Sequence, residues 1–360
     1  MRILIDIGHP AHVHLFKNFA HRMMAEGHQL LFTLRDKEFE KNLVEKEGFN
    51  YISIGKKYNS LSGKILGLIC FTYKLWCICR KYRPDILLSH GSIYAAWVSF
   101  FIHKPHIALE DTYNMEQVRL YRPFTNFIIT GNYPHPRLSK REFRIASYHE
   151  LAYLHPTYFT PSPSIYKELD LQPGTPYIIV RFVAWNASHD TGHCGMSLEN
   201  KHKALKALSS YGKVFISSES PLQGELAQYR LPTKPEQIHQ VIASATLLFG
   251  ESGTMAEEAA MLGVPSIFIY PKPVYYTQHL ESEYELLYHF DISNSEQLKA
   301  IEKAVNLLQD SHLHEKWKCR RDWMLKEKID ITALLCWIVT HYPYSKKLLL
   351  QKPNYQYHFM

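Results

Sequence analysis

Cysteine is scarce in this sequence, which has six among its 360 residues. That number is too small for a disulfide framework in a chain of this length, so we expect free thiols rather than a disulfide-stabilised secreted fold. Cys77 and Cys79 form a Cys-x-Cys pair without a second pair, which is a weak zinc signal. The opening residues, MRILIDIGHP, contain no long apolar region with a small-residue cleavage site. We therefore expect no secretory signal and a cytoplasmic protein.

The sequence also lacks a compact run of lysine and arginine interleaved with aromatic residues, which argues against a nucleic-acid partner. The net charge of +7 instead favours phosphate-bearing ligands or an anionic membrane surface. The apolar segment 61–84 is interrupted by Lys64 and Lys74, which makes it a poor transmembrane span. This segment is predicted to be either a core helix under a sheet or a basic amphipathic helix that rests on a membrane surface.

Short repeats and low-complexity tracts are absent, and the chain instead alternates short apolar strands with amphipathic helical segments. This alternation occurs in both halves and predicts parallel sheets covered by helices on both faces. One predicted helix follows the first strand and has an apolar stripe formed by Phe16, Phe19, Ala20, Met23 and Met24. Prolines and turn residues crowd together at 155–176, which is the best linker candidate.

The fold class that we predict is therefore α/β, with two doubly wound, Rossmann-like domains. We expect an amino-terminal domain at 1–160, a linker at 161–176 and a carboxy-terminal domain at 177–335. The remaining segment, 336–360, is expected to be a carboxy-terminal extension that returns to the amino-terminal domain.

The stretch 247–271, LLFGESGTMAEEAAMLGVPSIFIYP, has a polar centre between two apolar strands. Ser252 or Thr254 can cap the following helix, and Glu257 completes a capping-box pattern with Thr254. The glycines would let an anion approach the free backbone N–H groups at the positive end of the helix dipole. Thr254 and Glu258 share one helix face, so the stretch predicts either a capped helix start or a diphosphate site that extends to a ribose.

The pattern S-G-x-x-x-E-E-A-x-x-x-G-x-P at 252–265 resembles the donor-site motif of the GT-B superfamily. That superfamily includes UDP-GlcNAc-dependent transferases and the non-hydrolysing UDP-GlcNAc 2-epimerases. The resemblance implies a GT-B fold in which the two domains face a central cleft. It also implies that Ser252, Gly253 and Thr254 hold a diphosphate and that Glu258 takes the ribose hydroxyls, with no required cofactor.

The loop after the first predicted strand contains Gly8 in a tight turn, followed by His9, His12 and His14. Histidine is a suitable general base because its unperturbed pKa lies near working pH. The spacing H-x-x-H-x-H would also suit zinc, but the sequence reveals no carboxylate or cysteine partner, and we expect no metal. A polar loop with a helix-capping histidine is the remaining alternative.

The segment AHVHLFKNFAHRMMAEGHQL resembles the opening of the peptidoglycan GlcNAc transferase that acts on lipid I. The resemblance implies that His12 lies on the acceptor side. The double glycine and the proline of that family are missing here, which implies a different acceptor pocket. The opening I-D-I-G-H-P-A-H-V-H, with WNASHD and the donor motif, looks more like a domain-of-unknown-function family placed among GT-B proteins, over most of the chain.

The segment that begins at Arg181 follows the first strand of the second half and contains Asn186, His189 and Asp190. An arginine at a strand end can bind phosphate with two parallel hydrogen bonds. These residues are predicted to contact donor phosphate or the transferred sugar. The alternative is a loop that folds on itself.

His90, Gly91 and Ser92 resemble the H-G-D-T element of the epimerases, and Glu110 resembles the glutamate of their H-x-E-A element. Ser92 replaces the aspartate, and the epimerase H-R-R-E-N loop is absent, which puts epimerisation in doubt. Glu110 and its neighbour Asp111 are candidates for an acid/base pair with the amino-terminal histidine. Adjacent residues point apart, so we expect one of the two carboxylates to face substrate.

The sequence thus predicts a glycosyltransferase that moves a sugar from a UDP-sugar to a glycan or lipid-linked acceptor in cell-surface polysaccharide biosynthesis. The alternatives are an epimerase-like isomerase and a non-catalytic nucleotide-sugar-binding protein. The predicted catalytic residues are His12 and Glu110, and the predicted acceptor-side residues are His9, His14, His90 and Ser92. The predicted donor-binding residues are Gly8, Arg181, Asn186, His189, Ser252, Gly253, Thr254 and Glu258. A membrane surface is a further possible partner, which would make the cytoplasmic protein peripheral.

Overall fold

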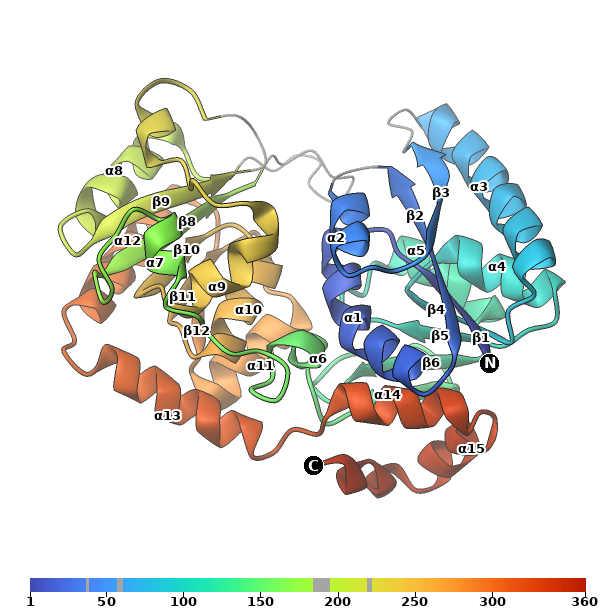
Figure 1. Cartoon of the computed structure of the whole chain (residues 1–360). Helices are drawn as coiled ribbons and strands as arrows, with labels where there is room; N and C mark the ends of the chain where they lie inside the picture. Colours follow the sequence, from blue (N-terminus) through green and yellow to red (C-terminus); the bar gives the residue numbers. More distant parts are fainter. Residues whose placement is uncertain (37–38, 57–60, 184–194, 219–221) are drawn as a thin grey trace. The chain divides into compact units, whose positions relative to one another are not determined.

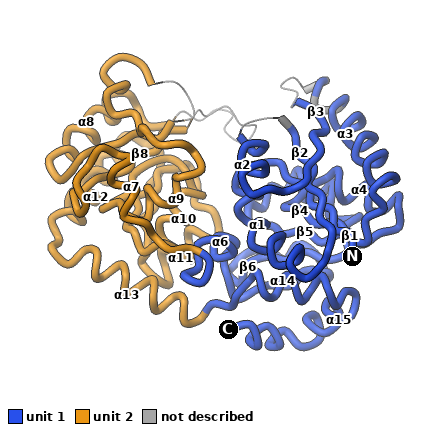
Figure 2. Tube along the Cα trace, viewed as in Figure 1, with its two compact units in different colours: residues 1–158, 328–360 blue, residues 159–327 orange. Residues whose placement is uncertain are grey.

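The computed structural model describes residues 1–36, 39–56, 61–183, 195–218 and 222–360. The chain divides into two compact units (Figure 2). Unit 1 consists of Met1–Tyr158 together with Lys328–Met360, and unit 2 consists of Phe159–Glu327.

Unit 1 contains a seven-stranded, all-parallel sheet with the strand order β3-β2-β1-β4-β5-β6-β7. Its inner strands are almost continuously apolar, as expected for a parallel sheet that is covered on both faces. The strands are β1 (Arg2–Asp6), β2 (Gln29–Asp36), β3 (Tyr51–Lys56), β4 (Ile86–His90), β5 (His106–Leu109), β6 (Phe127–Gly131) and β7 (Glu142–Ile145).

Helices cover both faces of this sheet (Figure 1). One layer contains α1 (Pro10–Ala25), α2 (Glu40–Lys46), α6 (Leu151–Leu154) and α14 (Ile331–Thr340), and the other contains α3 (Leu61–Tyr82), α4 (Ile93–Phe101) and α5 (Met115–Tyr121). Four residues of the predicted stripe on α1 are buried, but the fifth, Met24, is 42% exposed. The predicted stripe was therefore one residue too wide.

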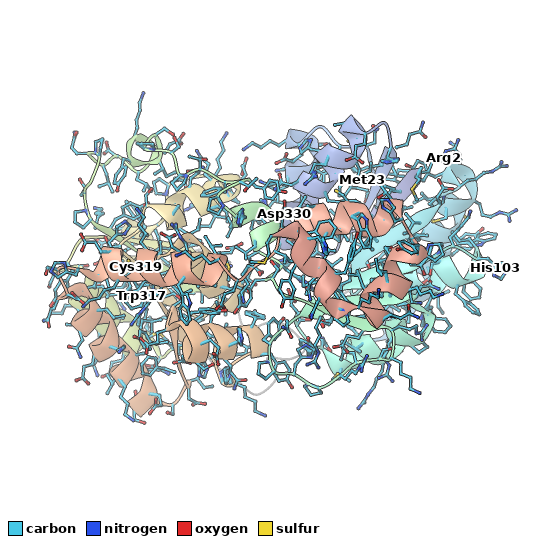
Figure 3. The ribbon with its side chains drawn as sticks, turned by 90° about the horizontal axis from the view of Figure 1, so that it is seen from below. Arg2, Met23, His103, Trp317, Cys319 and Asp330 are labelled. Atoms are coloured by element: carbon cyan, nitrogen blue, oxygen red, sulfur yellow. The ribbon has the colours of Figure 1, made fainter. Side chains whose placement is uncertain are left out.

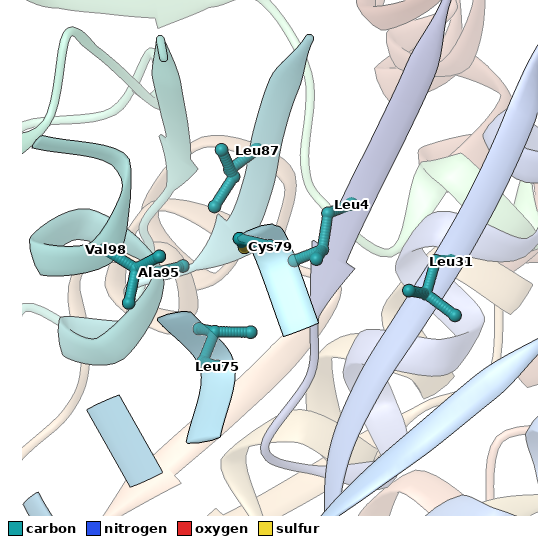
Figure 4. Packing of buried hydrophobic residues seen from close by; sticks show 7 residues of the cluster. All are labelled: Leu4, Leu31, Leu75, Cys79, Leu87, Ala95 and Val98. Atoms are coloured by element: carbon teal, nitrogen blue, oxygen red, sulfur yellow. The ribbon is translucent and has the colours of Figure 1, made fainter. Parts of the chain in front are cut away.

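Helix α3 packs one face against the sheet of unit 1. Leu75 and Cys79 of α3 meet residues of β1, β2, β4 and α4 in one apolar cluster (Figure 4). The other members of this cluster are Leu4, Leu31, Leu87, Ala95 and Val98. Burial raises the pKa of the Cys79 thiol to about 12, and the five cysteines within the described ranges are free, as predicted.

The opposite face of α3 exposes apolar side chains. Leu66, Ile69 and Tyr73 are 54%, 62% and 63% exposed, and their spacing places them along one side of the helix. The core-helix interpretation therefore accounts for one face of α3 only. No helix in the described ranges has both the length and the apolar character needed to cross a membrane.

The carboxy-terminal segment is tied into unit 1 by hydrogen bonds. Ile329 N–H donates to the Ala146 carbonyl at 3.0 Å, and Ala146 N–H donates to Gln356 Oε1 at 2.7 Å. Asp330 lies just before α14 (Figure 3), where it caps this helix, and it accepts a hydrogen bond of 2.5 Å from the Tyr158 hydroxyl. The segment ends in α15 (Tyr344–Gln351) and a 3₁₀ turn, η5 (Pro353–Phe359).

Unit 2 contains a second all-parallel sheet, with five strands in the order β12-β11-β10-β8-β9. The strands are β8 (Tyr177–Phe182), β9 (Lys213–Ser218), β10 (Leu247–Gly250), β11 (Ser266–Ile269) and β12 (Leu287–Phe290). The helices are α7 (Ile165–Glu168), α8 (Leu198–Leu208), α9 (Ile238–Ala243), α10 (Gly253–Leu262), α11 (Tyr275–Tyr284), α12 (Asn294–Leu308) and α13 (Leu313–Leu325). Two parallel sheets with helices confirm the predicted α/β class.

Candidate functional site

The loop between β1 and α1 depends on a glycine at position 8. A Cβ atom on Gly8 would lie 2.0 Å from Nη2 of Arg35, which itself donates to the Ile7 carbonyl at 3.2 Å. His9 caps α1 by accepting a hydrogen bond of 3.2 Å from Ala11 N–H. Gly8 therefore accommodates Arg35, and His9 begins the helix. Their donor and acceptor contacts remain predictions.

His12 lies in the first turn of α1 and is held by a hydrogen bond from the preceding loop. Its Nδ1 accepts a hydrogen bond from Gly8 N–H at 3.2 Å, so the neutral ring carries its proton on Nε2. Burial lowers the pKa of His12 well below its ordinary value, and the nearby His90 lowers it further. His12 is thus a neutral imidazole at working pH, which is the protonation state that a base requires.

Two predicted acceptor-side residues, His14 and Ser92, have structural contacts, and their acceptor contacts remain predictions. The His14 ring is buried, and its centroid lies 5.5 Å from that of Tyr153 in α6. The Ser92 hydroxyl donates to Asp6 at 2.5 Å and accepts from Ala95 N–H at 3.2 Å, which caps α4. Three zinc ligands from the H-x-x-H-x-H loop are not assembled, because His14 lies against Tyr153 and His9 caps α1.

Glu110 is buried and surrounded by donors from the segment that follows it. Its carboxylate accepts hydrogen bonds from the Thr112 hydroxyl and Tyr113 N–H, each at 2.8 Å, and from the Tyr121 hydroxyl at 2.5 Å. Three donors satisfy both carboxylate oxygens and fix the chain between β5 and α5. The geometry therefore gives Glu110 a structural role, and its predicted catalytic role is untested.

The neighbouring Asp111 instead holds two imidazoles. Its Oδ1 lies 3.0 Å from Nε2 of His90, and its Oδ2 lies 3.0 Å from Nδ1 of His149. We refer to His90, Asp111 and His149 as the His-Asp-His cluster. The His90 ring also lies beside His12, with 4.5 Å between ring centroids. The structure thus brings the predicted residues His12 and His90 together with Asp111, the predicted alternative to Glu110, and with His149, which the sequence did not suggest.

The Asp111 carboxylate controls the charge of the cluster. Burial of His90 opposes a positive charge, but the attraction and hydrogen bond of Asp111 prevail and raise the pKa of His90 to about 9. Burial of Asp111 would raise its own pKa, yet the charge of His90 and the hydrogen bonds from both imidazoles hold it well below the ordinary value. His90 and Asp111 therefore form an ion pair at neutral pH.

His149 was missed by the sequence reasoning, although the topology contains a signal for it. His90 ends β4, Asp111 lies two residues beyond β5, and His149 follows β7. The carboxyl ends of parallel strands meet at one edge of the sheet, which is where open α/β sheets bind ligands. The strand before His149, β7, has the sequence EFRI. Its two charged residues interrupt the apolar run by which a strand is predicted.

The β10–α10 loop in unit 2 has the geometry of an anion site. Ser252 is the N-cap of α10: its hydroxyl accepts from Met255 N–H at 3.4 Å, and its carbonyl accepts from Ala256 N–H at 3.0 Å. The N–H groups of Gly253 and Thr254 have no hydrogen-bond partner within the described part of the chain. Two amides at the positive end of a ten-residue helix are thus available to an anion.

Two glycines allow this loop its close packing. A Cβ atom on Gly250 would lie 2.2 Å from the Arg181 carbonyl oxygen of β8, which is closer than any real contact. A Cβ atom on Gly253 would lie 3.1 Å from the Tyr276 hydroxyl. Gly250 thus allows β10 to approach β8, and Gly253 leaves room for the Tyr276 hydroxyl at the start of α10.

The predicted phosphate-binding segment after β8 is described only at its two ends. Arg181 Nη1 donates to the Ser217 hydroxyl at 3.1 Å. The buried Glu251 accepts hydrogen bonds from Val183 N–H at 3.0 Å and Met196 N–H at 2.6 Å, so it holds both ends of the segment. The predicted residues Asn186, His189 and Asp190 lie outside the described residues.

Glu258, the predicted ribose ligand, lies on α10 one turn beyond Thr254. It is 4% exposed, and its Oε1 lies 2.9 Å from Nε2 of His239 in α9. In this structure Glu258 pairs with a buried histidine that the sequence did not suggest. A ribose contact by Glu258 stays a prediction.

The overall fold is similar to that of solved sugar-nucleotide enzymes. The UDP-GlcNAc 2-epimerase from Neisseria meningitidis, bound to UDP-GlcNAc, aligns with a TM-score of 0.65 and 12% identity over 94% of this chain and 100% of that one. The SsfS6 glycosyltransferase of Streptomyces sp. SF2575 aligns with a TM-score of 0.60 and 13% identity over 93% and 99%. These likenesses confirm the predicted GT-B fold.

Sequence comparison gives a relative and a family. An uncharacterized protein of Methanocaldococcus jannaschii, MJ0665, is 26% identical over 284 residues, which are 75% of this chain and 82% of that protein. The family described as "Protein of unknown function (DUF354)" matches residues 1–331. Because this match spans most of the sequence, the chain belongs to the DUF354 family.

Proposed function

We propose that this protein is a GT-B glycosyltransferase that moves a sugar from a UDP-sugar to a glycan or lipid-linked acceptor in polysaccharide biosynthesis. The observation that carries the proposal is the pair of open amides on Gly253 and Thr254 at the carboxyl end of β10. A similarly folded epimerase is bound to UDP-GlcNAc, and another protein of this fold is a glycosyltransferase. Both likenesses support a nucleotide-sugar as the ligand.

In this proposal, the start of α10 binds the diphosphate of the donor. The two free N–H groups and the helix dipole would stabilise the charge that develops on the leaving diphosphate, so the step needs no cofactor. Ser252 would shape this end of the helix, and Arg181 would add a positive charge at the end of the neighbouring strand. Glu258 would bind the ribose hydroxyls after giving up part of its contact with His239.

His12 is the proposed proton acceptor for the hydroxyl of the sugar acceptor. Its lowered pKa keeps the ring neutral, as a base requires. The acceptor hydroxyl would have to compete with Gly8 N–H for the lone pair on Nδ1. Replacement of His12 by alanine should remove turnover and leave UDP binding unchanged. Retained turnover would exclude this role for His12.

An epimerase is the second candidate, because the fold is similar to that of a UDP-GlcNAc 2-epimerase. Two observations argue against it: Ser92 donates to Asp6, and Glu110 is enclosed by three donors. Incubation with UDP-GlcNAc alone separates the two enzymes, because an epimerase changes the sugar without an acceptor. A non-catalytic binding protein would bind UDP-sugar but would neither epimerise the sugar nor transfer it to an acceptor.

A membrane surface is the proposed location of the acceptor. The exposed Leu66, Ile69 and Tyr73 on α3 are apolar, and Arg80 and Lys81 follow in its last turn, a combination that suits an anionic lipid surface. We expect the protein to sediment with vesicles that contain anionic lipid. Ile69→Glu should weaken this sedimentation, because it places a charge in the apolar stripe.

A matched control for this test is Leu198→Glu, which changes a similarly exposed leucine on α8 of unit 2. This control should leave vesicle binding unchanged. Equal binding by wild type and Ile69→Glu, or no binding by either, would exclude α3 as the membrane contact.

A further inference from the structure

The His-Asp-His cluster contains the donor atoms of a metal site. His90, Asp111 and His149 each offer one ligand atom, and the three atoms lie within 4.8 Å of one another. They are the only group of this kind found in the described ranges of the chain. All three residues belong to unit 1, so the cluster is complete within one compact body.

The spacing of the atoms agrees with coordination of one ion. Ligand atoms lie about 2.0 to 2.2 Å from a bound Zn²⁺, which puts neighbouring ligands of one ion roughly 3 to 3.6 Å apart. The two nitrogen-to-oxygen distances in the cluster are both 3.0 Å. The two distances involve different oxygens of Asp111, so coordination would require loss of the His90 proton and a small movement of the three side chains toward one ion.

The cluster is also held in place by the sheet. His90 ends β4, and Asp111 and His149 follow the carboxyl ends of β5 and β7. The backbone hydrogen bonds of the sheet fix His90, and short segments place Asp111 and His149 near the same edge, which lowers the conformational entropy lost when the ligands are ordered.

A second observation shows that the described protein atoms do not satisfy the cluster by themselves. Nδ1 of His149 faces Asp111, while its Nε2 is buried without a hydrogen-bond partner among the described residues. His149 is 4% exposed, so bulk water does not serve this atom. Nε2 lies on the side of the ring away from Asp111, so an ion held at Nδ1 would not contact it, and a buried water molecule is the ordinary partner for such an atom.

We propose that His90, Asp111 and His149 bind one divalent transition-metal ion. Two imidazoles and one carboxylate are the ligand set of open sites for Zn²⁺ and related first-row ions, which keep at least one position for water or another ligand. Mg²⁺ and Ca²⁺ prefer oxygen ligands and fit this set less well. His12 is outside the ligand set, because its Nδ1 accepts from Gly8 N–H. The proposal does not rest on the nucleotide-sugar proposal, since its three ligands lie in unit 1 and the proposed diphosphate site at the start of α10 lies in unit 2.

The test is titration of the metal-depleted full-length protein with Zn²⁺, followed by calorimetry and by metal analysis after dialysis. We expect one tightly bound ion per chain. Asp111→Asn and His149→Gln keep similar side-chain size and should each weaken binding on the order of 100-fold. The control is His312→Gln, which removes an exposed histidine 3.2 Å from Glu315 and should leave the affinity unchanged.

Absence of binding by the wild-type protein would overturn the proposal. So would equal affinity in wild type, Asp111→Asn and His149→Gln, because the ion would then lie elsewhere. If either variant fails to fold, as judged by near-ultraviolet circular dichroism, X-ray absorption of the zinc-loaded wild-type protein decides. Two imidazoles with oxygen ligands support the site, whereas sulfur in the coordination shell would place the ion on an exposed cysteine such as Cys77 or Cys319.

Discussion

His106 shows how burial sets the charge of a single side chain. It lies at the start of β5, fully buried between the hydroxyls of Ser89 at 2.9 Å and Thr125 at 3.0 Å. Burial without a carboxylate partner lowers the pKa of His106 to about 3. His90 is buried beside Asp111, and its pKa moves in the opposite direction. Neighbouring charge, rather than burial alone, therefore decides which histidine of this sheet is cationic.

The low pKa of His106 makes stability depend on pH. The unfolded chain takes up a proton below pH 6.5, whereas the folded protein does not until about pH 3, so acid favours unfolding. Protonation of His106 in the unfolded chain should therefore lower the free energy of unfolding by about 2 kcal/mol when the pH falls from 7.5 to 5.0. Urea unfolding of wild type and His106→Gln at the two pH values measures this cost as the difference in pH dependence.

The control is His314→Gln, which changes an exposed histidine in α13. This variant should keep the pH dependence of the wild type. A His106→Gln protein that loses stability in acid as steeply as the wild type would mean that the folded protein protonates His106 at an ordinary pH.

The sequence allowed part of the site to be predicted at the level of residues. His12 and His90 could be found because they follow apolar strands, and chemistry at strand ends is expected in parallel sheets. The sequence could not decide whether Glu110 or Asp111 contacts the nearby histidines, because this depends on Tyr121, whose hydroxyl donates to Glu110. Contacts of this kind become visible only when the chain is folded.

Gly250 shows how one residue controls the packing of two elements. Its missing Cβ lets β10 approach β8, since an added Cβ would lie 2.2 Å from the Arg181 carbonyl oxygen. Backbone atoms cannot rotate away as a side chain can, so Gly250→Ala should separate the strands. We expect a loss of unfolding free energy of about 3 kcal/mol or more, which denaturant unfolding measures.

Gly174→Ala is the comparison for this variant. Gly174 has a φ of +82° and no atom within 4 Å of an added Cβ, so alanine there meets only conformational strain. That strain costs about 1 kcal/mol. Equal losses in the two variants would contradict the packing argument for Gly250.

The elements themselves followed from the sequence where apolar periodicity was strong. β1, β10 and α1 are long or apolar enough to be recognised, whereas β7 has buried Glu142 and half-buried Arg144 in four residues. These two side chains pair with each other at 3.1 Å. A strand that contains an ion pair lacks the apolar pattern by which strands are recognised. Because β7 was not predicted, His149, which follows it, was not predicted to lie at the edge of the sheet.

At the scale of the whole molecule, the chain leaves unit 1 after Tyr158 and re-enters it at Lys328. Gln356 fixes this return, because its buried amide accepts from Ala146 N–H at 2.7 Å. Gln356→Ala would leave that N–H unpaired, at a cost of about 1 to 3 kcal/mol. Hydrogen exchange should become faster in the amides of unit 1 near β7 and stay unchanged in unit 2.

Gln309→Ala is the matched control, since it removes an exposed glutamine that donates to the Tyr211 hydroxyl in unit 2. Little change is expected in either unit. Faster exchange in unit 2 caused by Gln356→Ala would contradict the assignment of the carboxy-terminal segment to unit 1 alone.

The α/β class could be predicted because alternation of strands and helices extends over the whole chain and does not depend on any one contact, whereas the GT-B fold was implied by the resemblance of 252–265 to a donor-site motif. Binding of the sugar donor depends on single residues, because it requires that the N–H groups of Gly253 and Thr254 donate hydrogen bonds to a diphosphate. Calorimetric titration of UDP into wild type, Gly253→Val and Leu198→Val measures this directly. Leu198 follows the N-cap of α8 as Gly253 follows that of α10, so it is the matched helix start.

We expect one UDP to bind per wild-type chain and Leu198→Val to bind equally well. Gly253→Val should bind at least about tenfold more weakly, because its branched side chain obstructs the amides. No binding of UDP by the wild-type protein, or undiminished binding by Gly253→Val, would contradict a donor site at the start of α10.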